Sequence, residues 1–280
     1  MSNVALLALI VGATATPAPA VQVGAAGECV VSTETGAPPS SADERKALAA
    51  CNEARNRFAE LFGEPVPGVR IIFWDEPHYR MGLLQGEAAI FWPTGEAMTP
   101  QKVDPAVAEL HLEKQWREVL PHEIAHLLLA VRFFREDHGP ADGYGTPLPD
   151  WLDEAVAIWA EPPASLEKRV AQARELPAEY LDLRSILTRP HPAAGQSAGY
   201  IARDGTARPA DFELWAFYPQ AVAVLAFIHE HGGSAATQEL VRRLLADPSD
   251  LTPLAGLPGL PDDFGGVEAL WKEWLARGDR

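Results

Sequence analysis

The sequence has 280 residues, which is long enough for one large domain or two small ones, and its 47% hydrophobic content supports a sizeable core. It carries 39 acidic against 23 basic residues, a net charge of −16. Because phosphate binding needs a basic footprint, this balance argues against nucleic acid and anionic membrane surfaces as partners.

The first twenty residues predict a signal peptide. They contain no charged side chain, an apolar run from Val4 to Val11, and the small-residue sequence APA at 18 to 20, which fits signal-peptidase cleavage. The predicted location is therefore periplasmic or extracellular. Since no Lys or Arg precedes the apolar run, a buried first strand or a mis-assigned start is the alternative. The run is too short to span a bilayer, and no later segment is better suited.

Cys29 and Cys51 are the only cysteines, and both lie beyond the predicted cleavage point. An even count at close spacing fits one disulfide in an exported protein. Two free buried thiols are the alternative for a cytosolic protein.

The first predicted elements are one helix and two strands. Ser41 and Glu44 form a capping-box pattern, and helical apolar spacing continues from there to Gly63. The runs at 69 to 74 and 86 to 92 are rich in β-branched and aromatic residues, so they predict strands of a small sheet.

From Pro105 onward the apolar spacing is helical. Two connections rich in Gly and Pro, 135 to 149 and 188 to 210, interrupt the helices, and loops of this length are commonly functional. With strands early and helices late, the predicted fold class is α+β. The predicted helices span roughly 105–119, 121–134, 150–160, 166–175, 218–231, 235–246 and 266–277.

The segment LPHEIAHLLLA, 120 to 130, places His122 and His126 four residues apart with Glu123 after the first. On a helix, residues i and i+4 share one face, so both imidazoles can bind one metal ion. Glu123 would then lie beside the ion, where a carboxylate can act as a general base. Two hydrogen-bonded histidines on an apolar helix are the alternative. Because Pro121 is unfavourable inside a helix, we expect a new helix or a kink near 120.

A catalytic zinc site needs a third protein ligand, which should come from another element. The segment LPDWLDEAVAIWAE, 148 to 161, predicts a helix that Asp150 caps and that carries Glu154 among apolar neighbours. A carboxylate in such surroundings is costly unless it is paired or binds a metal. Glu161, two turns later, is the competing candidate. Asp153 either orients a ligating histidine or is a solvated aspartate.

Together these segments resemble the gluzincin branch of zinc metallopeptidases, and especially bacterial peptidase MA-like domains. In that family HExxH precedes a helix with a W-x-x-E-G-x-A-like sequence, and here WLDEAVA follows HEIAH. The resemblance covers roughly 105 to 275 and includes FYPQAVAVLAFIHEHGG and LWKEWL further on. It implies Zn²⁺ as the cofactor, His122, His126 and Glu154 as its ligands, and Glu123 as the general base.

The resemblance also implies one zincin-like domain over 21 to 280. A small mixed sheet with helices would form a lobe at about 21 to 134, a helical lobe would cover about 135 to 280, and the active-site cleft would lie between them. The implied activity is hydrolysis of a peptide bond in a peptide or protein substrate, with Glu123 activating the zinc-bound water. Tyr218 is the implied oxyanion donor, and an ordinary packed tyrosine is its alternative.

Two features qualify this interpretation. Ala155 replaces the usual glycine after the ligand glutamate, so a catalytically inactive zinc-binding protein of the same fold is the alternative function. The sequence GQSAG at 195 to 199 matches a nucleophile elbow, but the strand and helix that such an elbow needs are missing around it. We therefore do not expect Ser197 to be a nucleophile.

The other histidines lack ligand spacing. His229 and His231 are two residues apart on a predicted helix and so point in different directions. Surface positions are expected for the remaining four, which are His78, His111, His138 and His191.

Overall fold

The computed structural model describes residues 27–33, 39–76, 78–84, 87–98, 104–133, 146, 148–192, 200–201, 207–208, 212–250 and 252–277. The predicted signal peptide lies outside these residues. The chain divides into two compact units, an N-terminal unit of residues within 2–59 and 64–145 and a C-terminal unit of residues within 60–63 and 146–280. Among the described helices, none combines the length and apolarity that crossing a membrane requires.

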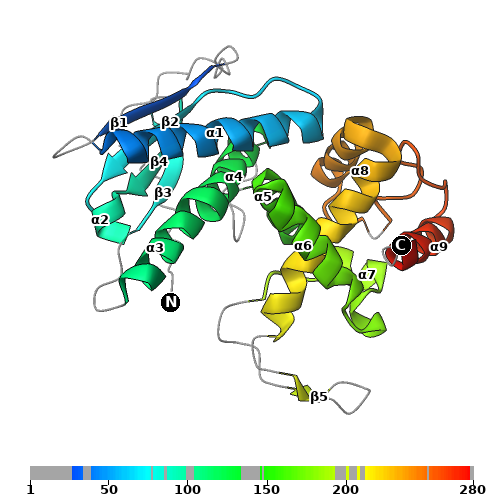
Figure 1. Cartoon of the computed structure of the whole chain (residues 1–280). Coiled ribbons are helices and arrows are strands. Elements are labelled where there is room, and N and C mark those ends of the chain that lie inside the picture. The colour runs from blue at the N-terminus through cyan, green and yellow to red at the C-terminus, as the bar shows by residue number, and fades with distance from the viewer. Residues whose placement is uncertain are drawn as a thin grey trace, which may run out of the picture. The chain divides into compact units, whose positions relative to one another are not determined.

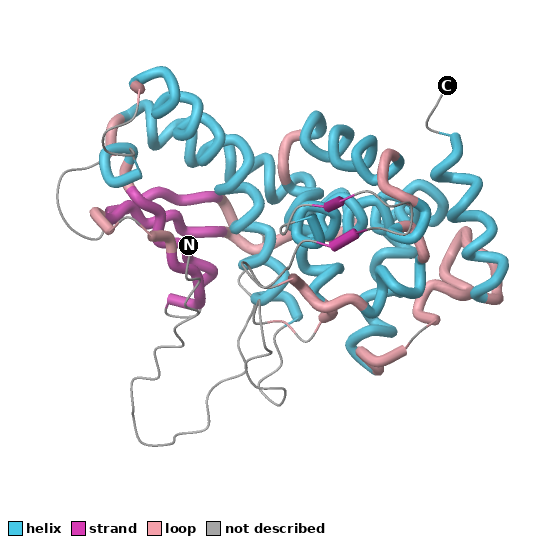
Figure 2. Tube along the Cα trace, turned by 90° about the horizontal axis from the view of Figure 1, so that it is seen from below, coloured by secondary structure: helices cyan, strands magenta, loops and turns pink. Residues whose placement is uncertain are grey.

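The N-terminal unit contains a four-stranded mixed sheet in the order β1-β2-β4-β3, drawn in magenta in Figure 2. β1, β2 and β4 are parallel, and β3 pairs with β4 in the antiparallel direction. The predicted strands at 69–74 and 86–92 are confirmed, whereas the two edge strands, β1 and β3, were not predicted. The bounds are β1 Cys29–Thr33, β2 Val69–Trp74, β3 Arg80–Leu84 and β4 Glu87–Pro93.

One face of this sheet is apolar and buried, because alternate side chains of a strand point to the same side. Along β2 and β4 the paired residues on this face are Val69 with Ala88, Ile71 with Ile90, and Phe73 with Trp92, all of them buried. These pairs form the core on this face, and Ile72, Trp74 and Ala89 are buried on the opposite face.

The helix α1, Ser41–Phe62, is confirmed almost to the residue. Its N-terminal cap differs from the prediction by one position, because the Ser40 hydroxyl, not that of Ser41, accepts a hydrogen bond from the backbone N–H of Asp43 at 3.1 Å. The same hydroxyl donates to the Asp43 carboxylate. The reciprocal pair is thus Ser40 with Asp43 and not Ser41 with Glu44.

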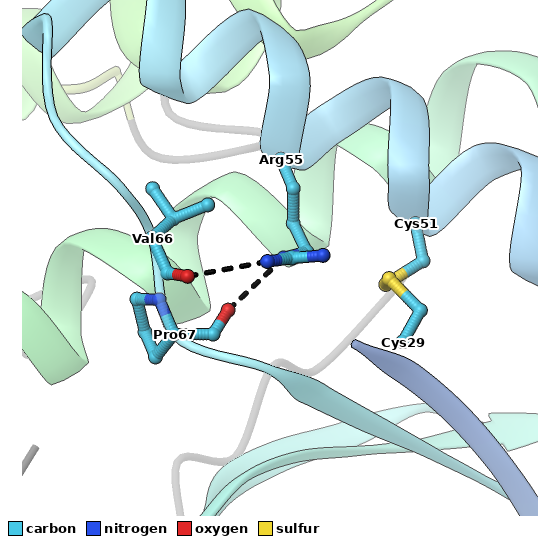
Figure 3. Close-up of a disulfide and its surroundings, with 5 residues drawn as sticks. All are labelled: Cys29, Cys51, Arg55, Val66 and Pro67. Carbon is cyan, nitrogen blue, oxygen red and sulfur yellow. Dashed lines mark hydrogen bonds between the residues drawn. A yellow bond between two sulfur atoms is a disulfide. The ribbon is translucent and has the colours of Figure 1, made fainter. Parts of the chain in front are cut away.

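A disulfide joins Cys29 on β1 to Cys51 on α1, with the two Cα atoms 6.2 Å apart (Figure 3). Of the two alternatives that the sequence left open, the structure has the bridge and not the free thiols. Cys29 pairs with Val69 in the sheet register, so the bridge attaches α1 to the buried face. One turn further along α1, Arg55 donates to the carbonyl oxygens of Val66 and Pro67, which fixes the entry to β2.

A continuous helical run leads into the predicted metal-binding segment. It consists of α3 (Pro105–Lys114), a π-helical turn η1 (Gln115–Val119) and α4 (Leu120–Phe133), after a short α2 (Gly95–Met98). The discontinuity expected near 120 is therefore a π turn within a continuous helical run, and Pro121 lies just after this turn, as the second residue of α4. Trp116 of η1 packs against Phe73 and Trp92 and so anchors this turn on the sheet.

In the C-terminal unit, the long helix α8 packs against α5, α6 and α7, as Figure 1 shows for the yellow and green segments. The helix predicted at 150–160 is confirmed as α5 with the same bounds, and those predicted at 166–175 and 266–277 are confirmed as α6 and α9 with shifts of one to three residues at their ends. A two-stranded antiparallel hairpin pairs Tyr200–Ile201 with Ala207–Arg208. The helix bounds are α5 Asp150–Ala160, α6 Pro163–Arg174, η3 Ala178–Tyr180, α7 Leu183–Thr188, α8 Phe212–Ala246 and α9 Phe264–Ala276.

The helices predicted at 218–231 and 235–246 are parts of α8, which begins six residues earlier than expected and bends at Gly233, where φ is +60°. A loop packs tightly against this bend. A Cβ atom built on Gly232 would lie 2.0 Å from the carbonyl oxygen of Pro258, and one on Gly259 would lie 2.2 Å from that of His231. Glycine is therefore required on both sides of this contact.

The described elements, a four-stranded sheet within the first hundred residues and mostly helices after it, confirm the α+β class. The zincin-like fold and the cleft between the two lobes stay predictions.

Candidate metal centre

The two predicted histidine ligands lie on one face of α4. The Nε2 atoms of His122 and His126 are 3.2 Å apart, and their rings meet edge to face at 76°. His126 is 2% exposed, while His122 is half-buried. The segment Ile124 to Leu129 is buried, so the apolar side chains that flank the motif hold this part of α4 in the core.

The predicted third ligand lies on α5. Glu154 is 2% exposed, and all residues from Trp151 to Ala160 are buried, which confirms the apolar surroundings expected for it. The cap prediction is wrong, because no side chain caps the N-terminus of α5. The Asp150 carboxylate instead accepts a hydrogen bond from the backbone N–H of His191 at 3.0 Å.

The structure brings the three predicted ligands together. One ligand atom each of His122, His126 and Glu154 lies within 4.8 Å of the others, and these residues form a group whose donor atoms are close enough to hold a metal ion. Two imidazoles and one carboxylate match the donor set that the sequence predicts.

Glu123, the predicted general base, is 8% exposed. Among the residues that the structure describes, none makes a hydrogen bond or an ion pair with its carboxylate. A buried carboxylate that no described residue engages can accept a proton from a substrate or a water molecule.

The competing carboxylates have other partners. Glu161 is buried and forms an ion pair with Arg169, with an N–O distance of 3.3 Å. This salt bridge explains a buried carboxylate without a metal, so Glu161 is not needed as a ligand. Asp153 is also buried, which overturns the solvated alternative, and it accepts a hydrogen bond from the Thr146 hydroxyl. Its predicted contact with a ligating histidine stays a prediction.

Tyr218, the predicted oxyanion donor, is not at the start of a helix but in the second turn of α8, directly before Pro219. Its hydroxyl oxygen lies 3.2 Å from Nε2 of His191. The same nitrogen lies 3.8 Å from Oε1 of Glu154. His191 is therefore not an isolated surface residue, because it contacts both the predicted third ligand and the predicted oxyanion donor.

No spacing rule could have found His191, since its partners are 37 and 27 residues away along the chain. The one available signal was its place in the long 188–210 connection, a kind of segment that is commonly functional.

The remaining histidines among the described residues do not belong to the candidate metal-binding group. His229 packs edge-on against Trp159, and Nδ1 of His231 lies 2.8 Å from the carbonyl oxygen of Phe227, one turn earlier in α8. His78 is exposed, and His111 is half-buried. His138 and the GQSAG segment with Ser197 lie outside the described residues.

Comparison with known proteins adds no assignment, since no protein-family model, no curated protein and no solved structure matches this chain.

Proposed function

We propose that this protein is a zinc-dependent peptidase of the gluzincin type, in which His122, His126 and Glu154 hold the metal. The observation that carries the proposal is the convergence of two imidazole nitrogens and one carboxylate oxygen from two helices. Burying such a group costs free energy unless the charges are compensated, and a divalent cation provides that compensation.

The spacing of the imidazole nitrogens supports zinc in particular. Zinc binds imidazole nitrogen at 2.0–2.1 Å in tetrahedral geometry, which places two such nitrogens about 3.3 Å apart. The observed separation of 3.2 Å between the Nε2 atoms agrees with this value. Three protein ligands of the His, His and Glu type leave one position for water or substrate, as catalytic zinc sites require.

In the proposed reaction, a zinc ion held by His122, His126 and Glu154 would supply Lewis-acid chemistry, which would polarise the scissile carbonyl and lower the pKa of the attacking water. Glu123 takes the proton from this water and delivers it to the leaving amine, which is the role of a general base that then becomes a general acid. The Tyr218 hydroxyl donates a hydrogen bond to the oxyanion that forms at the former carbonyl.

The disulfide supports the proposal of export to the periplasm or the extracellular space, because disulfides persist mainly in oxidising compartments. The substrate is then a peptide or protein outside the cytoplasm.

The test is the zinc content per chain, measured by elemental mass spectrometry on protein purified without a chelating resin. We expect about one zinc in the parent. Glu154→Gln should lose most of it, whereas Glu161→Gln, which removes the competing carboxylate at similar volume, should keep it. A parent that binds no added zinc contradicts the proposal.

Zinc binding alone does not establish hydrolysis, because an inactive protein of the same fold would also bind the metal. A library of unstructured peptides distinguishes the two functions. Zinc-dependent cleavage that is lost in Glu123→Gln supports the peptidase, whereas a zinc-loaded parent that cleaves no peptide supports the inactive alternative.

A further inference from the structure

His191 occupies a fixed position beside the candidate metal centre. It follows α7, and the hydrogen bond from its backbone N–H to the Asp150 carboxylate connects it to the first residue of α5. Its ring lies edge-on to Phe217, at 5.1 Å between centroids, and its side chain is 23% exposed. Both the backbone and the ring of His191 are therefore fixed by contacts, so the direction in which its Nε2 atom points is also fixed.

The ring of Tyr218 is held as firmly. The Arg169 guanidinium lies 5.8 Å from the ring centroid, and Phe217 packs against the ring at 80°. Arg169 is itself fixed by its ion pair with Glu161. With the ring fixed, the main freedom left to the side chain is the direction of its hydroxyl proton.

The contact between His191 and Tyr218 can be made in two ways. Either Nε2–H donates to the phenol oxygen, or the phenol donates to an unprotonated Nε2. The two arrangements differ in consequence, because a phenol that donates to His191 has no proton left for an oxyanion.

Glu154 decides between these arrangements. Its Oε1 atom lies 3.8 Å from the same Nε2 atom. A carboxylate facing an imidazole lone pair is repelled, whereas a carboxylate facing an N–H is attracted. The tautomer with the proton on Nε2 is therefore favoured, in keeping with the usual effect of a carboxylate on a neighbouring histidine.

We propose that His191 is a positioning residue whose Nε2–H donates a hydrogen bond to the Tyr218 hydroxyl oxygen, so that the phenol is an acceptor toward His191 and does not spend its own proton on this contact. Glu154 thus has two roles, as a metal ligand and as the group that selects the His191 tautomer. The catalytic part of this inference rests on the proposed peptidase function, while the direction of the hydrogen bond does not.

The direction is tested by NMR on the zinc-loaded protein with ¹⁵N-labelled histidine, at about pH 8, where an ordinary imidazole is neutral. The signals missing from His191→Gln identify the two nitrogens of His191. We expect an N–H at Nε2 and an unprotonated Nδ1. The opposite tautomer would overturn the inference whether or not the protein cleaves peptides.

The catalytic part is tested with a double-mutant cycle of His191→Leu and Tyr218→Phe on a cleaved peptide. We expect each variant to keep its zinc and KM and to lose at least about tenfold in kcat. Because His191 acts through Tyr218, the double variant should be no slower than Tyr218→Phe alone. His191→Gln, whose amide retains a donor, should recover part of the loss.

The positioning role would be overturned if the fold losses in kcat of the two single variants multiplied in the double variant. A change confined to KM would overturn it as well. A loss of zinc from His191→Leu would likewise contradict it and make His191 a residue that supports the metal ligands. If the zinc-loaded parent cleaves no peptide, the catalytic part fails together with the proposed function, and the NMR result alone decides the hydrogen-bond direction.

Discussion

Glu123 and Glu154 are both buried carboxylates, and their surroundings differ. Glu154 lies with the two histidine nitrogens, whereas Glu123 has no hydrogen-bonding partner among the described residues. A ligand must converge with other ligands, and a general base must keep its oxygens available, so the structure fits the predicted roles.

Replacement of Glu123 by Gln should therefore leave about one zinc per chain and lower kcat/KM roughly 10²- to 10⁴-fold, the range that general base catalysis contributes. Zinc content and peptide cleavage are measured on the same preparation. Glu109→Gln is the matched control, since this exposed carboxylate lies on the same helical run. Retained cleavage in Glu123→Gln would show that another group accepts the proton.

At the scale of residues, the sequence predicts those contacts that depend on a short spacing along one helix. The i and i+4 rule places His122 and His126 together because both lie on one helix. The contacts of His191 with Glu154 and Tyr218 depend on how separate segments fold back on one another, and no local pattern encodes that. The cap at Asp150 fails for the same reason, because a distant backbone N–H takes its carboxylate.

At the scale of elements, the disulfide between β1 and α1 should stabilise the folded protein by an amount that can be measured. The strand has only five residues and lies at the sheet edge, where pairing on one side alone holds it. Replacing Cys29 and Cys51 together by Ala should lower the free energy of unfolding by about 3 kcal/mol, since the bridge closes a loop over a separation of 22 residues.

Denaturant unfolding of the parent and the double variant measures this difference. Reductant should destabilise the parent and leave the double variant unchanged. Equal stability of the two oxidised proteins would mean that strain in the folded state offsets the entropy that the bridge removes from the unfolded chain.

The bend in α8 leads to a second prediction at the scale of elements. Gly→Ala normally stabilises a helix by up to about 1 kcal/mol. At Gly232 the sign should reverse, because the new methyl group would overlap the Pro258 carbonyl, and we expect a loss of about 1–3 kcal/mol. Gly82→Ala is the control, since a Cβ there meets no atom within 4 Å. Thermal unfolding compares the two, and an unchanged Gly232→Ala would mean that the loop moves aside at little cost.

Elements with strong periodicity, such as α1, α5 and β2, follow from the sequence. The short edge strands do not, because five residues with little burial give a weak alternation signal. The π turn and the continuous α8 are also missed. A proline predicts a helix start, but it does not tell whether the preceding helix continues through a π turn or, as at Pro219, runs past it.

For the molecule as a whole, the acidic composition makes the response to low pH informative. The pKa of Glu239 is lowered to about 2 by hydrogen bonds from Arg242 and Arg243. Because the folded pKa lies below its usual value of 4.5, this group stabilises the protein fully above that value, and the contribution is lost as the pH falls toward 2. Arg243 also donates to the Gly256 carbonyl, so the carboxylate supports the loop against the bend.

Urea unfolding midpoints at about pH 6 and about pH 3 test this, because the stabilisation is partly lost at the lower pH. Glu239→Gln should be less stable than the parent at the higher pH and should lose less on acidification. Glu273→Gln, an exposed carboxylate on α9, is the control for the change in net charge. If the urea midpoint fell equally in the parent and in Glu239→Gln on acidification, the stabilising role of the Glu239 carboxylate would be contradicted.

The class of the whole fold could be predicted, because it needs only the order of strands and helices. Its family could not be established, since a zinc motif is short and recurs on unrelated folds. The lobe arrangement depends on contacts among many separate segments, which the sequence pattern does not encode.

The π turn before α4 sets the rotational phase of the helix that carries the histidines. Around an uninterrupted α-helix, with about 100° per residue, Ala108 and Ile124 would lie about 160° apart. Both are buried, as is Trp116 within the turn. The extra residue of the turn removes most of that offset, so three side chains spaced eight apart share one face. Deleting a single residue from 115 to 119 would leave HEIAH unchanged in sequence but would rotate both histidines away from the side they now occupy.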